Sequence, residues 1–166
     1  AATPEILVRL AKLLADQDLY VRLAVVKAVG RIGAPAATPE ILARLATLLD
    51  DRTPDVRNAA AIAVGGIGAP AATPEILVRL AKLLADQEWT VRGAAAHAMR
   101  GIGAPAVTPA FLARLATLLD DRDSKVRAAA ADAVGGIGAL AATPEILAQL
   151  ATLLADENYW VRLRAE

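Results

Sequence analysis

Few residues in this sequence could carry acid–base or metal chemistry. His97 is the only histidine, and the neighbouring carboxylates Asp50-Asp51 and Asp120-Asp121 could in principle form catalytic pairs. A general base or a metal ligand needs partners at motif spacing, and His97 has none. The aspartate pairs belong to an LLDD segment that alternates with LLAD along the chain, so turn formation explains them. We therefore expect no catalytic residue, no metal site and no cofactor, and hence a non-enzymatic protein.

Composition argues against several other functions. The 18 basic and 18 acidic side chains cancel, so no overall field favours nucleic acid or an anionic membrane. Without cysteine there is no disulfide framework and no thiolate chemistry. The GGIGAP segment at residues 65–70 lies between two helical patterns, whereas phosphate-binding loops follow a strand. The chain shows no leader-like segment and no apolar run of membrane length, so we expect a soluble, cytoplasmic protein.

The elements that position these side chains are tandem repeats. Residues 1–17 recur letter for letter at 71–87, and the complete unit is 35 residues long. We divide the chain, as one domain, into repeats 1–35, 36–70, 71–105 and 106–140 and a partial repeat 141–166.

Each unit opens with a helix that buries one face. A Thr-Pro pair supplies an N-cap hydroxyl and a proline at the first helical position. These N-caps are Thr3, Thr38, Thr73, Thr108 and Thr143. In the first unit the apolar stripe expected to be buried consists of Ile6, Leu7, Leu10, Leu13 and Leu14.

A second helix follows after a short turn. Its predicted N-caps are Asp18, Thr53, Asp123 and Asn158, with Glu88 as a weaker cap in the third unit. In the first unit we expect it to bury Val21, Ala24, Val25, Ala28, Val29 and Ile32. A glycine such as Gly33, in a left-handed conformation, would end it. Two helices of this length cannot bury their faces alone, so the units must stack into a solenoid with one continuous core.

The pattern DxxxxVRxAAxxAVGxIGAP resembles HEAT repeats of the PBS-lyase HEAT-like type, within the armadillo-type folds. The resemblance covers the whole chain and implies an all-α, right-handed α-solenoid of four and a half two-helix units, with the second helices on the concave side. It is specific for fold and weak for function, because such repeats serve as interaction scaffolds, sensor regions, lyase subunits and engineered frameworks.

The resemblance also implies a structural ladder of aspartates and arginines. The aspartates are Asp16, Asp51, Asp86, Asp121 and Asp156, and the arginines are Arg22, Arg57, Arg92, Arg127 and Arg162. Each arginine has an aspartate six residues upstream that could neutralise it. We therefore interpret the arginine row as part of the stacking interface and not as a phosphate-binding row.

Positions that differ between the units indicate where function could lie. They cluster on one side of the second helix, opposite the side that is constant between copies. We predict that they form a concave protein-binding face, which comprises Tyr20, Leu23, Lys27, Arg31, Asp55, Asn58, Ile62, Trp89, Thr90, His97, Arg100, Lys125, Asp132, Tyr159 and Trp160. Its small positive excess is too low to favour duplex DNA.

Both tryptophans and both tyrosines belong to this set and lie in odd-numbered units. Exposed aromatic side chains among varied polar ones are typical of an interface core. The alternative is that they cover the ends of the second helices and need no partner.

The sequence therefore favours a scaffold that presents a variable surface to a protein or peptide of unknown identity, with nucleic acid and membrane disfavoured as partners. Three alternatives stay open: a ligand-sensing array from a larger signalling ATPase, a bilin lyase-like subunit, and a designed repeat protein with no natural partner. Near-identical copies are consistent with recent duplication or with an engineered consensus. Because the first and last units carry no polar capping face apart from Arg164, we also expect either end-to-end self-association or excision from a longer array.

Overall fold

The computed structural model describes residues 3–166, and within this range the chain is helical without a strand. The first helices of the units, called A helices here, are α1 (Pro4–Leu13), α3 (Pro39–Leu49), α5 (Pro74–Leu83), α7 (Pro109–Leu119) and α9 (Pro144–Leu153). The second helices, called B helices, are α2 (Leu19–Ile32), α4 (Pro54–Ile67), α6 (Trp89–Ile102), α8 (Ser124–Ile137) and α10 (Tyr159–Ala165). Short 3₁₀ turns at Ala34–Ala36, Ala69–Ala71, Ala104–Ala106 and Gly138–Ala141 join one unit to the next.

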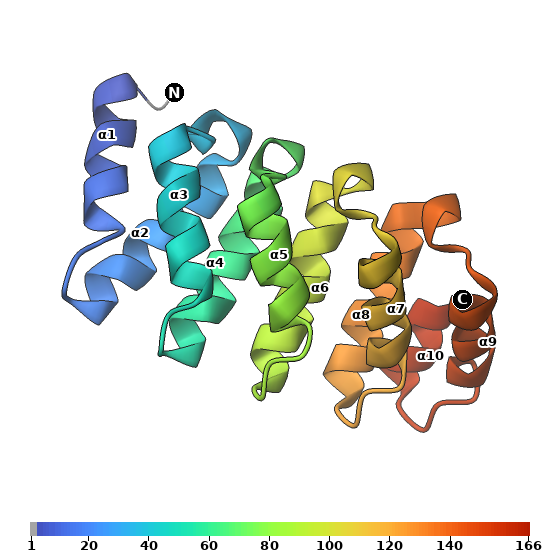
Figure 1. Cartoon of the computed structure of the whole chain (residues 1–166). Helices are drawn as coiled ribbons and strands as arrows, with labels where there is room; N and C mark the ends of the chain where they lie inside the picture. Colours follow the sequence, from blue (N-terminus) through green and yellow to red (C-terminus); the bar gives the residue numbers. More distant parts are fainter. Residues whose placement is uncertain (1–2) are drawn as a thin grey trace.

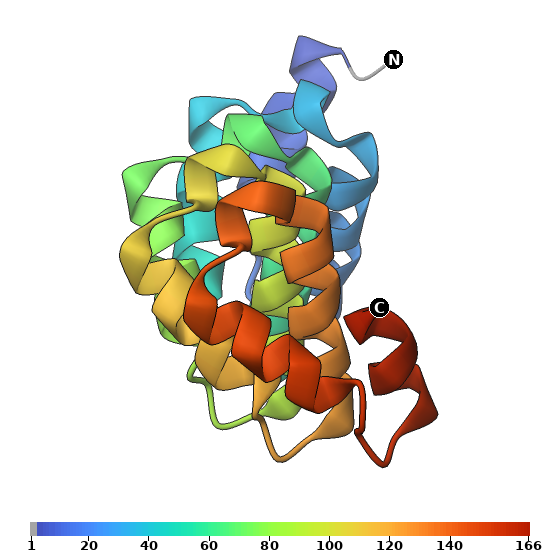
Figure 2. The same ribbon diagram turned by 90° about the vertical axis from the view of Figure 1, so that its right-hand side faces the viewer.

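The units stack side by side in two layers. A helices form the layer nearer the viewer in Figure 1, and B helices form the layer behind them. Viewed at right angles, successive units are rotated, so the stack twists along its length (Figure 2). Each helix packs on its counterpart in the next unit as well as on its partner within the unit, which is the arrangement that the 35-residue period predicts.

The A helices begin as the Thr-Pro pairs predict, with one exception. Thr38, Thr73, Thr108 and Thr143 each accept a hydrogen bond from the backbone N–H three residues on, at 3.1 to 3.3 Å. Thr3 occupies the N-cap position of α1 with extended backbone, but its side chain accepts no such bond.

The B helices are capped where the cap residue is Asp or Asn. Asp18, Asp123 and Asn158 accept from the backbone N–H two residues on. The prediction for Thr53 was wrong, since its hydroxyl makes no cap bond, and Glu88 makes none either. All five turns are held in another way: the aspartate at the end of the A helix accepts a hydrogen bond from the cap residue's own N–H, at 2.8 to 3.0 Å.

Four glycines end B helices with positive φ. Gly33 has φ 70° and ψ −143°, so φ is positive as expected, but ψ lies far from the left-handed helical value. The backbone reverses into the 3₁₀ turn there, a conformation that is essentially restricted to glycine.

Burial follows the predicted stripes inside the stack and departs from them in the first and last units. Ile41 and Ile76 are fully buried, whereas the equivalent Ile6 is 45% exposed and Leu13 is 40% exposed. Ala24, expected to be buried, is exposed for the same reason: no unit packs against that side of the first repeat.

One buried row was not predicted from the sequence. The position directly after Val25, which is not part of the predicted stripe, is buried in four units, where it is occupied by Val26, Ala61, Ala96 and Ala131. A B helix packs against an A helix and against B helices on its flanks, so it buries more of its circumference than a single stripe.

B helices come into backbone contact near their C-terminal ends. A Cβ on Gly30 would lie 2.9 Å from the Ala63 Cα, and a Cβ on Gly65 would lie 2.9 Å from the Ala98 Cα. Arg100 occupies the equivalent position in the third unit, and its side chain lies over Gly136. The atoms nearest to a Cβ on Gly136 therefore belong to the Arg100 side chain, whereas at Gly66 and Gly101 they belong to the backbone of the preceding B helix.

Candidate functional site: a groove along the B helices

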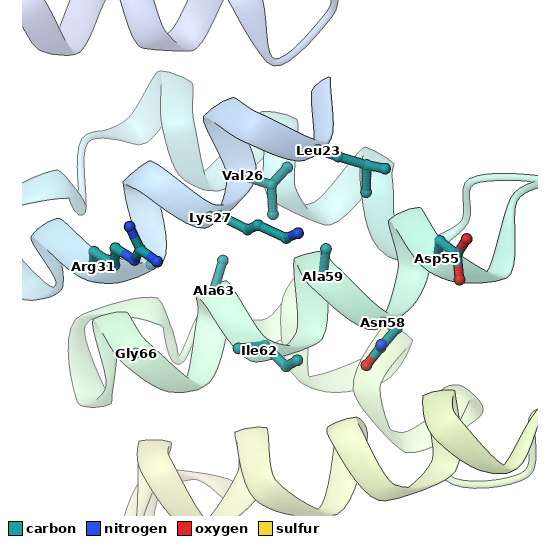
Figure 3. Close-up of a pocket in the computed structure, with 11 residues that line it drawn as sticks. Leu23, Val26, Lys27, Arg31, Asp55, Asn58, Ala59, Ile62, Ala63 and Gly66 are labelled. Carbon is teal, nitrogen blue, oxygen red and sulfur yellow. The ribbon is translucent and has the colours of Figure 1, made fainter. Parts of the chain in front are cut away.

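The exposed side of the B helices is hollowed between neighbouring units. A pocket of about 460 Å³ lies between α2 and α4 and is lined on its rim by Leu23, Lys27, Arg31, Asp55, Asn58 and Ile62. Figure 3 shows Lys27 and Arg31 extending from α2, with Asp55, Asn58 and Ile62 on α4. The floor is made of small or buried residues, Val26, Gly30, Ala59, Ala63 and Gly66.

A second pocket continues along the same face. It measures about 260 Å³, lies across α4, α6 and α8, and shares Asn58 and Ile62 with the first. Trp89, Thr90, His97 and Lys125 complete its polar and aromatic rim. Asn58 and Ile62 border both pockets, and we call the row of two pockets along α2, α4, α6 and α8 the B-helix groove.

Side chains of the groove are exposed and mostly free of internal bonds. Ile62 is 57% exposed, so its apolar side chain is available to a ligand at the border of both pockets. The Lys125 ammonium lies 4.3 Å from the centre of the Trp89 ring, a cation–π contact. Desolvation at the groove wall lowers the pKa of His97, so its imidazole is neutral at pH 7 and adds no charge.

The groove gathers ten of the fifteen residues of the predicted binding face. Those outside it are Tyr20, Arg100, Asp132, Tyr159 and Trp160. Asp132 forms an ion pair with Arg164 of α10. Tyr159 and Trp160 lie edge to face at the start of α10, with ring centres 5.5 Å apart. Of the four aromatic residues, Trp89 alone lines either of these two pockets.

The floor of the groove was not predicted from the sequence. Ala59 and Ala63 have small side chains and Gly66 has none, which leaves the space that the rim residues surround. The sequence contains one indication of this space. Ile62 is a large apolar residue at a varied position, with Ala59 three residues before it and Gly66 four residues after it on the same side of the helix.

The ladder residues form the other charged feature of the molecule. Arg92 donates from Nε and Nη2 to the two carboxylate oxygens of Asp121 at 2.7 and 2.8 Å, and from Nη1 to the backbone carbonyl of Asp86 at 2.9 Å. Arg57 with Asp86, and Arg127 with Asp156, repeat the bidentate pair. Each of these arginines thus ties its own A–B turn to the turn of the next unit.

This geometry corrects the predicted pairing. The aspartate six residues upstream contributes its backbone carbonyl, and the carboxylate comes from 29 residues downstream. The reason is that a B helix begins beside the turn of the following unit. The ladder is incomplete at its ends: Arg22 lies 3.8 Å from Asp51 with its Nε unpaired, and Arg162 bonds the carbonyls of Asp156 and Glu157.

The acidic pair Asp50-Asp51 also has a stacking role. Asp50 accepts hydrogen bonds from Arg79 at 2.8 Å and Lys82 at 3.1 Å on the next A helix, while Asp51 accepts from the Thr53 N–H. Within residues 3–166, no group of three or more histidine or acidic side chains is placed to hold a metal ion. No helix in the same range is long and apolar enough to cross a membrane.

Comparisons with known proteins agree with this architecture. The family model for HEAT repeats matches residues 41–117, and the model for the PBS lyase HEAT-like repeat matches residues 21–47. The chain is a HEAT/armadillo-like solenoid. No curated protein sequence matches this solenoid at a significant level.

Solved structures with the same fold include engineered and natural proteins. An engineered protein of the Northeast Structural Genomics Consortium is 24% identical, with a TM-score of 0.77 over 96% of this solenoid and 76% of that chain. A designed armadillo repeat protein in complex with the peptide (KR)4 is 22% identical, with a TM-score of 0.72 over 97% of this solenoid and 79% of that chain. The Escherichia coli protein YibA is 24% identical, with a TM-score of 0.72 over 97% of this solenoid and 57% of that chain.

Replacing Tyr20 and Trp160 together by alanine is expected to change the free energy of unfolding by less than about 1 kcal/mol. These two side chains are 79% and 62% exposed, so their truncation removes little buried surface from the solenoid, whereas Trp89 is only 37% exposed and is left unchanged. Urea denaturation followed by circular dichroism measures the change. A loss of several kcal/mol would show that the aromatics pack between units, as buried ones do.

Acid is expected to destabilise the solenoid through the ladder. The Arg127 hydrogen bonds lower the pKa of Asp156; at Asp86 and Asp121 burial raises the pKa, but arginine and backbone hydrogen bonds outweigh it and lower it overall. A folded-state pKa below the unfolded value of about 3.9 means that the stabilisation is present above that pH and is lost as pH falls through the folded values. Urea midpoints measured from pH 6 to pH 2.5 should fall, and Asp156→Asn should reduce the slope. A midpoint that is constant over this range would contradict the ladder's role.

Proposed function

We propose that the B-helix groove binds a peptide or protein segment and that the chain is a non-enzymatic interaction scaffold. The observation that carries the proposal is that two neighbouring pockets, both bordered by Asn58 and Ile62, lie on the side of the B helices whose residues differ between units. Side chains that are the same in every unit support stacking, whereas those of the groove rim vary between units and need not contribute to it. A structural neighbour, the designed armadillo repeat protein, was solved in complex with a peptide, which supports the same use of this fold.

The physical properties of the groove suit an extended segment. Its rim combines an exposed aliphatic side chain, an indole and several hydrogen-bonding groups, and its volume lies in the range of ligand pockets. A segment lying across the B helices would contact the α2–α4 pocket and then the smaller pocket across α4, α6 and α8. Neither pocket brings together a nucleophile, a base and an orienting group.

Selection from a displayed peptide library tests the proposal. Ile62→Glu places a charge at the junction of the two pockets, whereas Val78→Glu places the same charge on α5, where Val78 is 71% exposed on the A-helix layer. Peptides selected on the unaltered chain should bind Val78→Glu equally and Ile62→Glu at least about tenfold more weakly. Peptides that are insensitive to Ile62→Glu, or equally weakened by both changes, would refute the groove as the binding surface.

A second proposal concerns the ends of the 166-residue chain. Ile6 and Leu13 are exposed at one end, and at the other Leu154 is 52% and Leu163 is 42% exposed. Arg162 lacks the carboxylate that completes the inner rungs of the ladder within the described residues. We propose that a second copy supplies the missing contacts head to tail, as a following repeat would.

Such a contact is heterologous and does not close, so association should grow with concentration. Light scattering of the chain over a wide concentration range should show a rising mass, and Arg162→Glu should lower it. A monomer at every concentration would refute the proposal.

A further inference from the structure

The α2–α4 pocket carries two cations that no acidic side chain neutralises. Lys27 and Arg31 lie one helical turn apart on α2, and both are exposed at the pocket rim. Among residues 3–166, no carboxylate lies within ion-pair distance of either side chain. The arginines of the ladder, by contrast, have carboxylate partners in the inner units, so Lys27 and Arg31 are available to a ligand.

The acidic residues of the same face do not compensate for them. Asp132 forms an ion pair with Arg164, so its negative charge does not offset those of Lys27 and Arg31. Asp55 lines the α2–α4 pocket but lies at the end away from Arg31 (Figure 3). Arg100 and Lys125 add further positive charge along α6 and α8, and His97 is neutral. The whole chain has no net charge, yet this face has a local positive excess.

Beneath the two cations, the floor is lined by apolar residues that an aliphatic side chain could contact. Val26 and Ala63 are buried at the bottom, and Leu23 and Ile62 form apolar walls. A ligand group that satisfies both parts of the pocket has an aliphatic side chain next to a carboxylate. Burial of the first gains hydrophobic free energy, and the second gains charge-assisted hydrogen bonds from Lys27 and Arg31.

We propose that the groove is selective for an acidic segment, and that the α2–α4 pocket binds an aliphatic side chain flanked by a glutamate or aspartate. This inference rests on the proposed function and names the chemistry of its ligand. Complementary charge supplies selectivity and speeds association. A nucleic acid would need several phosphate contacts in a row, and the two adjacent cations of this pocket provide too few.

Fluorescence anisotropy with labelled peptides tests the inference on the whole chain. The probe is Gly-Ser-Glu-Leu-Glu-Ser-Gly, and its counterpart has lysine in place of both glutamates. The acidic probe should bind at least about tenfold more tightly than the basic one, and this preference should weaken as salt is raised. The double change Lys27→Glu with Arg31→Glu should remove or reverse the preference.

The chain offers a matched control on its opposite layer. Lys12 and Arg44 line a pocket of about 400 Å³ between α1 and α3, and both are exposed. Lys12→Glu with Arg44→Glu changes the net charge by the same amount but leaves the B-helix groove intact. This variant should retain the preference for the acidic probe.

Several results would overturn the inference. They are equal binding of the two peptides, loss of the preference in the control variant, no binding of the acidic probe, or tighter binding of a single-stranded DNA oligonucleotide through Lys27 and Arg31. The library selection separates this failure from that of the proposed function. Selected peptides that depend on Ile62 but are basic or uncharged would refute the acidic preference and leave the groove as the binding surface.

Discussion

Replacing Arg92 by alanine is expected to destabilise the fold by about 3–5 kcal/mol, the usual effect of breaking a buried ion pair. The Arg92 side chain is 8% exposed and that of Asp121 is 11% exposed. Without the guanidinium, the Asp121 carboxylate stays almost buried with only the Asp123 N–H to solvate it among the side-chain and backbone donors described. The carbonyls of Asp86 and Gln87 lose a donor as well. Urea denaturation at pH 7 measures the loss.

Arg22 provides the matched control for this experiment. It occupies the same position in its unit and bonds the carbonyls of Asp16 and Gln17 at 2.8 and 3.0 Å, but its carboxylate contact is a single one at 3.8 Å. Arg22→Ala should therefore cost less than half as much as Arg92→Ala. Arg92→Lys should recover only part of the loss, because an ammonium cannot form the two parallel hydrogen bonds. Equal effects of Arg22→Ala and Arg92→Ala would mean that the bidentate pair between units contributes little.

Replacing Gly66 by alanine is expected to destabilise the chain by about 1–3 kcal/mol, although alanine is the better helix former. The new Cβ would lie 2.6 Å from the Gly30 carbonyl oxygen and 3.3 Å from the Gly30 carbonyl carbon. Both atoms belong to the backbone of α2, so relief requires α2 and α4 to separate. That separation would loosen the contact between neighbouring B helices along their length.

Gly135→Ala is the control, because a Cβ there would meet no atom within 4 Å. In that variant the helix propensity acts alone, and a gain of about 0.5–1 kcal/mol is expected. The two variants make the same chemical change in helices of the same length, so their free energies of unfolding should differ in sign. If Gly66→Ala were as stable as Gly135→Ala, the close approach of the B helices would be wrong.

The sequence predicts the architecture because each unit repeats the same local signals. Thr-Pro pairs, apolar stripes and terminal glycines all point to the same two helices, and the period requires stacking. The partner of each ladder arginine could not be predicted in this way. A carboxylate six residues upstream and one 29 residues downstream occupy equivalent positions when the period is 35, so the sequence alone does not distinguish Asp51 from Asp86 as the partner of Arg57.

The groove was predictable in its rim and not in its floor. The rim could be found because its positions differ between units. Lys27 and Ile62 occupy equivalent positions in successive units, and Asn58 lies one helical turn before Ile62. Pockets, however, arise from the distance between adjacent helices, which depends on tertiary contacts such as the approach of Gly30 to Ala63. Arg100 illustrates the limit: glycine occupies the equivalent position in the first two units, at Gly30 and Gly65, and the Arg100 side chain lies over Gly136 instead.

The most direct test of the groove as the binding surface is chemical-shift mapping by NMR, with a library-selected peptide titrated into the isotopically labelled chain. We expect the largest changes at groove residues of α2, α4 and α6, among them Lys27, Asn58 and Ile62, with little change along α3 and α5. Changes spread over the A helices, or confined to the end units, would contradict the account.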